Sequence, residues 1–413
     1  MQEPSGSTAS TNPAADSRSG PASPAAADLD ELTDRDPASP APVDDPLDGV
    51  EDDEEADREQ VERERTRLKQ FVTSLDTDDI RSGGWFTKLA GQALGSYTDK
   101  VDAQYFQKRY KGVPADAVVD QRIKMAARYA ALEGGLSAGA YTAAVGATLG
   151  SLGGASPVTV PAAVATMMVD VTYVSQLQLR LAHDIAVLYG VPVDVSDPED
   201  MWKLIRVAFT IKSGGAVSEG VIKAAPVVIR PLIRRFYSGA TLNAARGFPV
   251  VGKYLLQRNV LKIGIPLVGV PLAAVLNRYT TLVAGRHARA VFRNEARVIE
   301  VAEKLTGRTA HPQLLLWVAW LVITADTKIS DDEALLMRHL VRLAEARHEL
   351  VDEALARLVD VDAAEVWERV AAEAGDLQDV LDAAAQVAAV DGDVNARERA
   401  VLSELGDRCT RAR

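Results

Sequence analysis

The sequence predicts a protein that is nearly all α-helix. Apolar residues recur at helical intervals over residues 59–75. A long run from Gly134 to Val169 contains no charged side chain, and the last hundred residues repeat one helix-loop-helix pattern. These observations favour four parts, which we expect at residues 1–58 (a tail), 59–114 (N-terminal helices), 115–300 (a helical domain) and 301–413 (a compact helical bundle).

The expected tail is acidic and rich in Pro, Ala and Ser, with hardly any large apolar side chain. Such a composition cannot bury enough surface to offset the entropy lost on folding, so we expect disorder.

The net charge of −12 conceals an asymmetry: residues 1–59 carry −14, residues 201–297 carry +14 and residues 301–413 carry −9. A basic middle would attract anionic lipid or nucleic acid, or would fold against the acidic ends.

Two features favour a cytoplasmic location. Cys409 is the single cysteine, so a disulfide framework within one chain is excluded. The first thirty residues lack the apolar segment of a secretory signal peptide.

Aromatic residues are 5% of the chain, which leaves few stacking platforms among the basic residues and argues against nucleic-acid binding.

The N-terminal helices begin with an amphipathic one. Val61, Leu68, Val72 and Leu75 fall on one stripe, and the helix should end before Asp76. Further helices are expected over the ranges 85–96, 99–110 and 115–132.

The uncharged run contains the motif Gly135-x-x-x-Gly139, repeated from Gly146, which predicts a groove that admits another backbone. Its length exceeds the roughly 20 apolar residues that span a bilayer, but small residues supply little transfer energy. Pro157 and Pro161 also interrupt it. We therefore expect a hairpin of two helices rather than one transmembrane span.

A long helix should follow over Val158 to Tyr189 and end at Gly190. Asp170, Arg180 and Asp184 lie among its apolar residues, and the last two have the i,i+4 spacing of a helical ion pair. Two interpretations are open: an internal ion pair with a solvated face, or a proton relay or ligand site.

The basic stretch from Lys212 to Arg297 alternates charged and apolar residues and contains several prolines. Short helices there would lie on an anionic membrane with their basic side chains reaching the phosphates. A second uncharged run, 263–277, is too short to span a bilayer and would be a buried turn or an interfacial insertion. The expected lipid contacts are Arg230, Arg234, Arg235, Lys253, Arg258 and Lys262.

Residues 115–300 resemble the EcsC protein family. The resemblance rests on the order of features: the glycine-rich hairpin, the segment MMVDVTYVSQLQLRLAHDIAVLYGVPVD, and a basic stretch leading to IPLVGVPLAAVLNRYTTLVAGRHARAVF. It implies a hydrophobic, helical bacterial protein associated with an ABC-transporter operon and without established chemistry. The residues that carry it are Asp170, Arg180, Gly190, Gly269 and Asn277.

The internal repeat aligns residues 324–337 with residues 389–402, at an offset of 65. In each copy an Asp precedes a Glu by seven positions. Residues 305–408 resemble the TerB family of tellurite-resistance proteins, whose repeats carry an A-x-D-G-x-[IV]-x-x-x-E motif. The second copy matches it, whereas Thr327 and Lys328 replace the glycine and the next acid in the first.

These loops have two interpretations. Ser330 and Asn395 would be N-caps, each closed by a Glu three residues later. Alternatively, carboxylates from both copies would bind Ca²⁺ or Mg²⁺, although the spacing is not that of an EF-hand; the TerB resemblance supports this second interpretation. The candidate ligands are Asp326, Glu333, Asp391, Asp393 and Glu398.

Ser137 stands in a Gly-x-Ser-x-Gly sequence, the pattern of a hydrolase nucleophile elbow. The residues before it have helical rather than strand composition, which disfavours a lipid or ester hydrolase.

The leading hypothesis is a non-enzymatic, membrane-associated adaptor in an envelope-stress or transport system, peripheral to the inner face of the cell membrane. It would bind an anionic surface or membrane protein, and a further protein through the last domain. A pore-forming hairpin is the other alternative.

Overall fold

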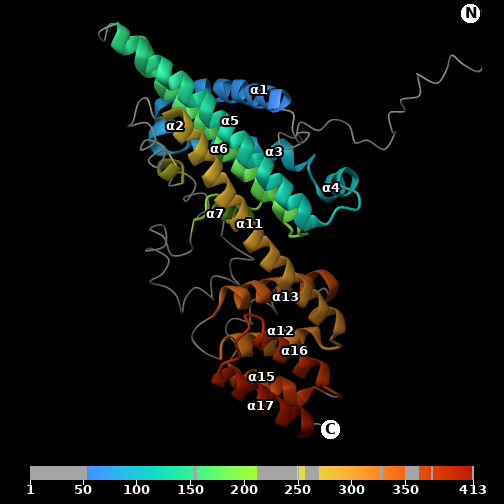
Figure 1. Cartoon of the computed structure of the whole chain (residues 1–413). Coiled ribbons are helices and arrows are strands. Elements are labelled where there is room, and N and C mark those ends of the chain that lie inside the picture. Colours follow the sequence, from blue (N-terminus) through green and yellow to red (C-terminus); the bar gives the residue numbers. More distant parts are fainter. Residues whose placement is uncertain are drawn as a thin grey trace, which may run out of the picture. The chain divides into compact units, whose positions relative to one another are not determined.

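A computed structural model describes residues 54–151, 156–211, 249, 251–255, 269–325, 329–348, 362–373 and 375–411. Within these ranges every regular element is a helix and none is a strand, which confirms the all-α prediction (Figure 1). The expected tail lies outside them except for residues 54–58. These five residues are helical, so the first helix begins earlier than the sequence indicated.

The first helices cover residues 54–109. A capping box between Asp76 and Asp79 begins the short second helix, and Gly83 ends it with φ +84°. This helix was not predicted, because it is one and a half turns long and buries no residue. The bounds are α1 Glu54–Ser74, α2 Thr77–Ser82, α3 Trp85–Thr98 and α4 Ala103–Arg109.

The predicted hairpin is formed by α5 (Ala115–Gly150) and α6 (Ser156–Leu188), which lie side by side in Figure 1. Gly190 ends α6 with φ +69°, and the Val191 N–H donates to the Ala186 carbonyl at 2.9 Å. This is the glycine-terminated helix end that the sequence predicted. The next helix, α7, spans Pro198–Ala208.

The close backbone contact in the hairpin occurs at Gly134. A Cβ there would lie 2.8 Å from the Ala273 carbonyl oxygen, on a later helix. Among the residues that the structure describes, none lies within 4 Å of a Cβ built on Gly135 or Gly139. The expectation that Gly135-x-x-x-Gly139 forms the groove was therefore wrong, since the motif lies one residue off the contacting face.

One helix, α11 (Gly269–Arg308), crosses the expected domain boundary at residue 300 and contributes to two hydrophobic cores. Phe292 belongs to the core formed by the preceding helices, whereas Val298 and Leu305 belong to the core of the C-terminal bundle. Trp317 and Trp320 are buried in that second core. The C-terminal helices are α12 Pro312–Ile323, α13 Asp331–His348, α15 Ala363–Ala372, α16 Gln378–Ala388 and α17 Ala396–Arg411.

The two neighbouring glycines give a matched test of the helix contact. Replacing either by alanine gains about 1 kcal/mol of helix propensity. Only Gly134→Ala also forces a methyl group against the Ala273 carbonyl, which costs about 1–3 kcal/mol. Urea denaturation should therefore give a free energy of unfolding lower for Gly134→Ala than for Gly135→Ala by that amount. Equal stabilities would show that α11 does not contact α5 at this point.

Candidate functional site

The acidic loops of the two repeats are closed by capping boxes. The Ser330 N–H donates to Glu333 Oε2 at 2.7 Å, and the Glu333 N–H donates to Ser330 Oγ at 3.2 Å. In the second copy the Asn395 N–H donates to Glu398 Oε2 at 2.9 Å, and the Glu398 N–H donates to Asn395 Oδ1 at 3.0 Å. The predicted capping role of both pairs is confirmed.

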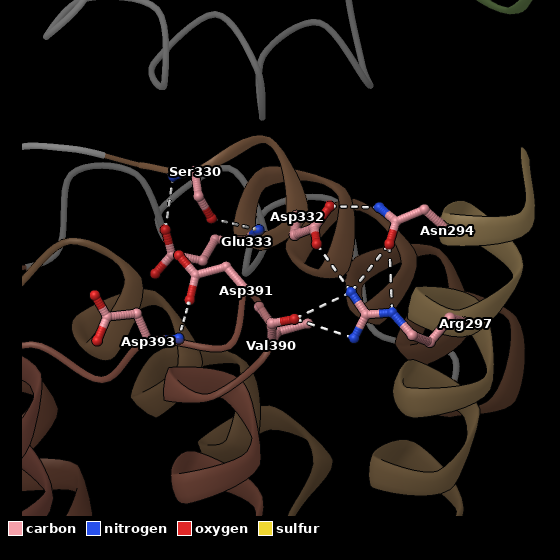
Figure 2. A network of polar contacts seen from close by, with 8 residues as sticks. All are labelled: Asn294, Arg297, Ser330, Asp332, Glu333, Val390, Asp391 and Asp393. Atoms are coloured by element: carbon pink, nitrogen blue, oxygen red, sulfur yellow. Dashed lines mark hydrogen bonds and ion pairs between the residues drawn. The ribbon is translucent and has the colours of Figure 1, made fainter. Parts of the chain in front are cut away.

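Carboxylates from the two copies face one another. Burial raises the pKa of Glu333, and the negative charges of Asp391 and Glu398 raise it further, although hydrogen bonds from Ser330 oppose the rise. The Asp391 carboxylate accepts a bond from the Asp393 N–H at 3.1 Å (Figure 2). Electrostatic repulsion between the copies is therefore relieved locally by backbone N–H groups.

The metal interpretation of these loops is untested. Asp326 lies outside the described residues. Among those that the structure describes, no group of three or more His, Cys, Asp or Glu side chains has an arrangement that would hold an ion. Calcium or magnesium binding by Glu333, Asp391, Asp393 and Glu398 stays a prediction.

Beside these loops, Arg297 connects α11 to both repeats. Its Nη1 and Nη2 each lie 3.1 Å from the Val390 carbonyl oxygen, and Nη2 lies 2.9 Å from Asp332 (Figure 2). Asn294 Nδ2 donates to the same carboxylate at 2.6 Å. This network could not be predicted from the sequence, because its residues are far apart in the chain and form no recognisable motif.

A buried ionic network joins α7, α11 and α13. Lys203 Nζ lies 2.6 Å from Glu295 Oε1, which also lies 3.4 Å from His339 Nε2. Burial lowers the pKa of Lys203, and the charge of Glu295 only partly offsets this. Arg338 Nη2 forms a second pair with Asp200 at 2.7 Å. These contacts hold the C-terminal bundle against the preceding helices.

The ion pair expected between Arg180 and Asp184 is wrong, because each turns toward a different helix. Asp184 Oδ2 lies 2.6 Å from Arg122 Nη2 of α5, and its Oδ1 accepts from the Tyr97 hydroxyl at 2.8 Å. Burial tends to raise the pKa of Asp184, but the charge of Arg122 and the hydrogen bonds from His183 and Arg122 outweigh it and leave that pKa lowered. Arg180 instead reaches α1 and α3.

Another polar cluster lies where the hairpin enters the core. Asp170 Oδ1 accepts from Asn277 Nδ2 at 2.7 Å. Nearby, Glu133 Oε1 accepts from the Ser137 hydroxyl at 2.5 Å, and Glu133 Oε2 lies 3.5 Å from Arg65 Nε. Burial raises the pKa of Glu133 to about 7, against the opposing effects of Ser137 and Arg65.

Ser137 has no nucleophile-elbow geometry. An elbow needs a strand that feeds a strained turn, whereas Ser137 is buried inside the uninterrupted helix α5. Its hydroxyl is bonded to a carboxylate one turn earlier on the same helix. The serine therefore acts as a helix-internal partner of Glu133.

The part of the hairpin beyond this cluster, residues 138–167, is called the distal hairpin below. It carries no charged residue. Of its side chains that the structure describes, in 138–151 and 162–167, none is buried, and Val164 is 49% exposed. The described helices include none that combines the length and the apolar character needed to cross a bilayer.

A second exposed apolar feature lies on α11. Val275, Tyr279 and Val283 follow one another at intervals of four and are 60%, 63% and 38% exposed. Arg278 and Arg286 lie exposed beside them. We call these five residues the α11 stripe.

One of the expected lipid contacts can be placed. Lys253 is exposed on a helical turn at 251–255. That turn packs tightly on the α2–α3 connection, since a Cβ on Gly252 would lie 2.4 Å from the Gly83 carbonyl oxygen. The expected contacts that lie outside the described residues are Arg230, Arg234, Arg235, Arg258 and Lys262.

The elevated pKa of Glu133 predicts a pH-dependent stability. Because the folded pKa, about 7, exceeds the ordinary value of 4.5, this carboxyl favours folding below pH 4.5, and the benefit is lost as pH rises through 7. The loss is on the order of 3 kcal/mol. Glu133→Gln should remove this component from unfolding curves recorded between pH 5 and 8, while exposed Glu59→Gln should not. An unchanged pH profile in Glu133→Gln would contradict the burial of this carboxyl.

The capping interpretation predicts different effects for neighbouring residues of the second repeat. Asn395→Ala should lower the free energy of unfolding by about 1 kcal/mol, because the first N–H groups of α17 lose their acceptor. Asp393→Asn should change it by less than about 0.5 kcal/mol. Calorimetric unfolding with and without calcium checks both. Calcium stabilisation of the parent chain that Asp393→Asn abolishes would support the metal interpretation instead.

Comparison of the chain with protein-family models, curated protein sequences and solved structures gave no match. The resemblances to the EcsC and TerB families therefore stay predictions. Two features of the described chain bear most directly on its function: the uncharged distal hairpin and the α11 stripe.

Proposed function

We propose that this protein is a non-enzymatic adaptor that binds the surface of an anionic membrane through the distal hairpin. The observation that carries the proposal is a combination of two properties in one segment. Residues 138–167 are uncharged, and their described side chains are not buried in the protein. An uncharged segment whose described side chains are all partly or fully exposed is typical of a contact site for a membrane or another protein.

The size of the distal hairpin favours shallow insertion. Its α5 part, residues 138–150, is about 20 Å long at 1.5 Å per residue. The hydrocarbon core of a bilayer is about 30 Å thick. The segment would therefore lie in the headgroup region and one leaflet.

Basic residues would supply attraction to anionic lipid. The α11 stripe combines apolar side chains with Arg278 and Arg286, which is the composition of helices that lie at a membrane interface. Residues 201–297, which include this stripe and Lys253, carry a net charge of +14. Each basic residue near an anionic surface contributes about 1 kcal/mol.

The adaptor role follows from the opposite charge of the C-terminal bundle. Residues 301–413 carry −9 and would be repelled by an anionic surface. They would face away from the membrane and be available to a protein partner or a divalent cation. The resemblance to the EcsC and TerB families suggests an envelope-stress or transport system at the cytoplasmic face.

Two exposed valines give a matched test. Val164 in the distal hairpin and Val113 before α5 are 49% and 46% exposed. In sedimentation with phosphatidylglycerol-containing vesicles, Val164→Asp should lower the binding constant about fivefold, since a negative charge held near an anionic surface costs about 1 kcal/mol. Val113→Asp adds the same charge elsewhere and should bind like the parent chain.

The conditions of this experiment separate the alternatives. High salt should weaken the electrostatic part of the binding but leave the part due to hairpin insertion. Leakage of an encapsulated dye would favour the pore-forming alternative. If the parent chain ignores anionic vesicles at low salt, or if both valine variants bind equally, the proposed membrane contact is refuted.

A further inference from the structure

A polar pocket of about 180 Å³ lies between α1, α3 and α6, apart from the distal hairpin and the acidic loops. It is smaller than the roughly 300–1,000 Å³ of sites for drug-sized ligands. Its lining includes three basic side chains, Arg67, Lys100 and Arg180, and one carboxylate, Glu64. Gln92 and Ser96, both exposed on α3, add neutral donors, and Lys100 lies in the turn that follows this helix.

The carboxylate in this pocket is already satisfied. Glu64 is 4% exposed and accepts from Gln176 Nε2 at 2.9 Å and from Arg67 Nη1 at 3.0 Å. Arg180 Nη1 lies 3.8 Å from it. Glu64 therefore holds the arginines in place, and the lining keeps a net positive charge of about two.

Arg180 is held in a fixed position with donor capacity left over. Its Nε donates to the Ala93 carbonyl at 3.0 Å, and its guanidinium lies over the Tyr97 ring at 4.9 Å. The side chain is 12% exposed, and its buried Nη1 makes no hydrogen bond within the described part of the chain. A guanidinium fixed at the wall of a positively charged pocket suits an oxyanion, because its N–H groups match the geometry of phosphate oxygens.

We propose that this pocket binds a small phosphate monoester, with Arg180 contacting the phosphate oxygens from the floor and Lys100 from the rim. The phosphate would come either from a soluble metabolite or from a lipid headgroup. The Tyr97 hydroxyl, which donates to Asp184, connects the pocket to the buried Arg122–Asp184 pair. A ligand here would therefore join α1 and α3 to the central hairpin helices.

Titration calorimetry of the full chain with glycerol phosphate tests the soluble source, and sedimentation with phosphatidic acid vesicles tests the headgroup. Lys100→Gln should weaken whichever interaction occurs about threefold to tenfold, since one charge-assisted contact is lost. Lys124→Gln, an exposed lysine on α5, is the matched control and should bind like the parent chain. Arg180→Lys keeps the charge but loses the forked geometry and should weaken binding at least as much.

Each outcome decides the proposal. Weakening by Lys100→Gln in either arm supports it and identifies the source. Absence of binding in both arms overturns it, as does binding that Lys100→Gln leaves unchanged. Lys100 is exposed at the rim, so its variant should fold even if Arg180→Lys does not. Vesicle binding that Val164→Asp weakens and Lys100→Gln leaves unchanged would overturn the pocket proposal and leave the membrane proposal standing.

Discussion

Charges buried between helices must be paired, and this constraint fixes the arrangement of the N-terminal half. Arg122 and Asp184 are both fully buried, 2.6 Å apart, and the Tyr97 hydroxyl completes the contact from α3. Removing one partner of such a pair costs about 3–5 kcal/mol, because an uncompensated charge stays behind in the core. The pair therefore sets the register of α5 against α6, and α3 against both. The pocket floor at Arg180 lies one helical turn along α6 and depends on that register.

A second constraint comes from α11, which packs in both hydrophobic cores. Its Phe292 lies in one core and its Val298 in the other. Between these two positions in the sequence, Glu295 contacts α7 and α13, and Arg297 contacts the second repeat. The C-terminal bundle is thus attached through one helix by both apolar and ionic contacts. In the described part of the distal hairpin, Met167 at its base packs against the first core, and no described side chain is buried. The membrane proposal rests on this lower burial of the distal hairpin.

Periodicity and glycine placement predicted most of the helices, because these signals act locally. The end of α6 at Gly190 and the capping boxes at Ser330 and Asn395 depend on residues close in sequence. The partners of Arg180 could not be predicted in this way, since i,i+4 spacing shows which side chains share a helix face but not which neighbour covers that face. Arg122 and Glu133 were missed for the same reason. The sequence alone does not show which partner a single charged residue of a helix will contact, because that partner depends on how the helices pack.

The expected site residues divide similarly. The capping role of Glu333 and Glu398 was readable from a three-residue spacing, whereas the contact between the two repeats requires the tertiary fold. The pocket around Arg180 is assembled from α1, α3 and α6, so its residues show no pattern along the chain. Gly134, rather than its neighbour in the Gly-x-x-x-Gly motif, proved to be the contact residue because a one-residue shift rotates the contact face by about 100°.

The most direct test of the membrane contact is a fluorescent probe in the distal hairpin. Cys409 is the single cysteine, so a Cys409→Ser background allows one environment-sensitive label at Ala147→Cys, an exposed position. On addition of phosphatidylglycerol-containing vesicles, the emission should shift to shorter wavelength, as expected when the label enters an apolar layer. An unchanged spectrum while the protein sediments with the vesicles would contradict the proposal, because another surface would then make the contact.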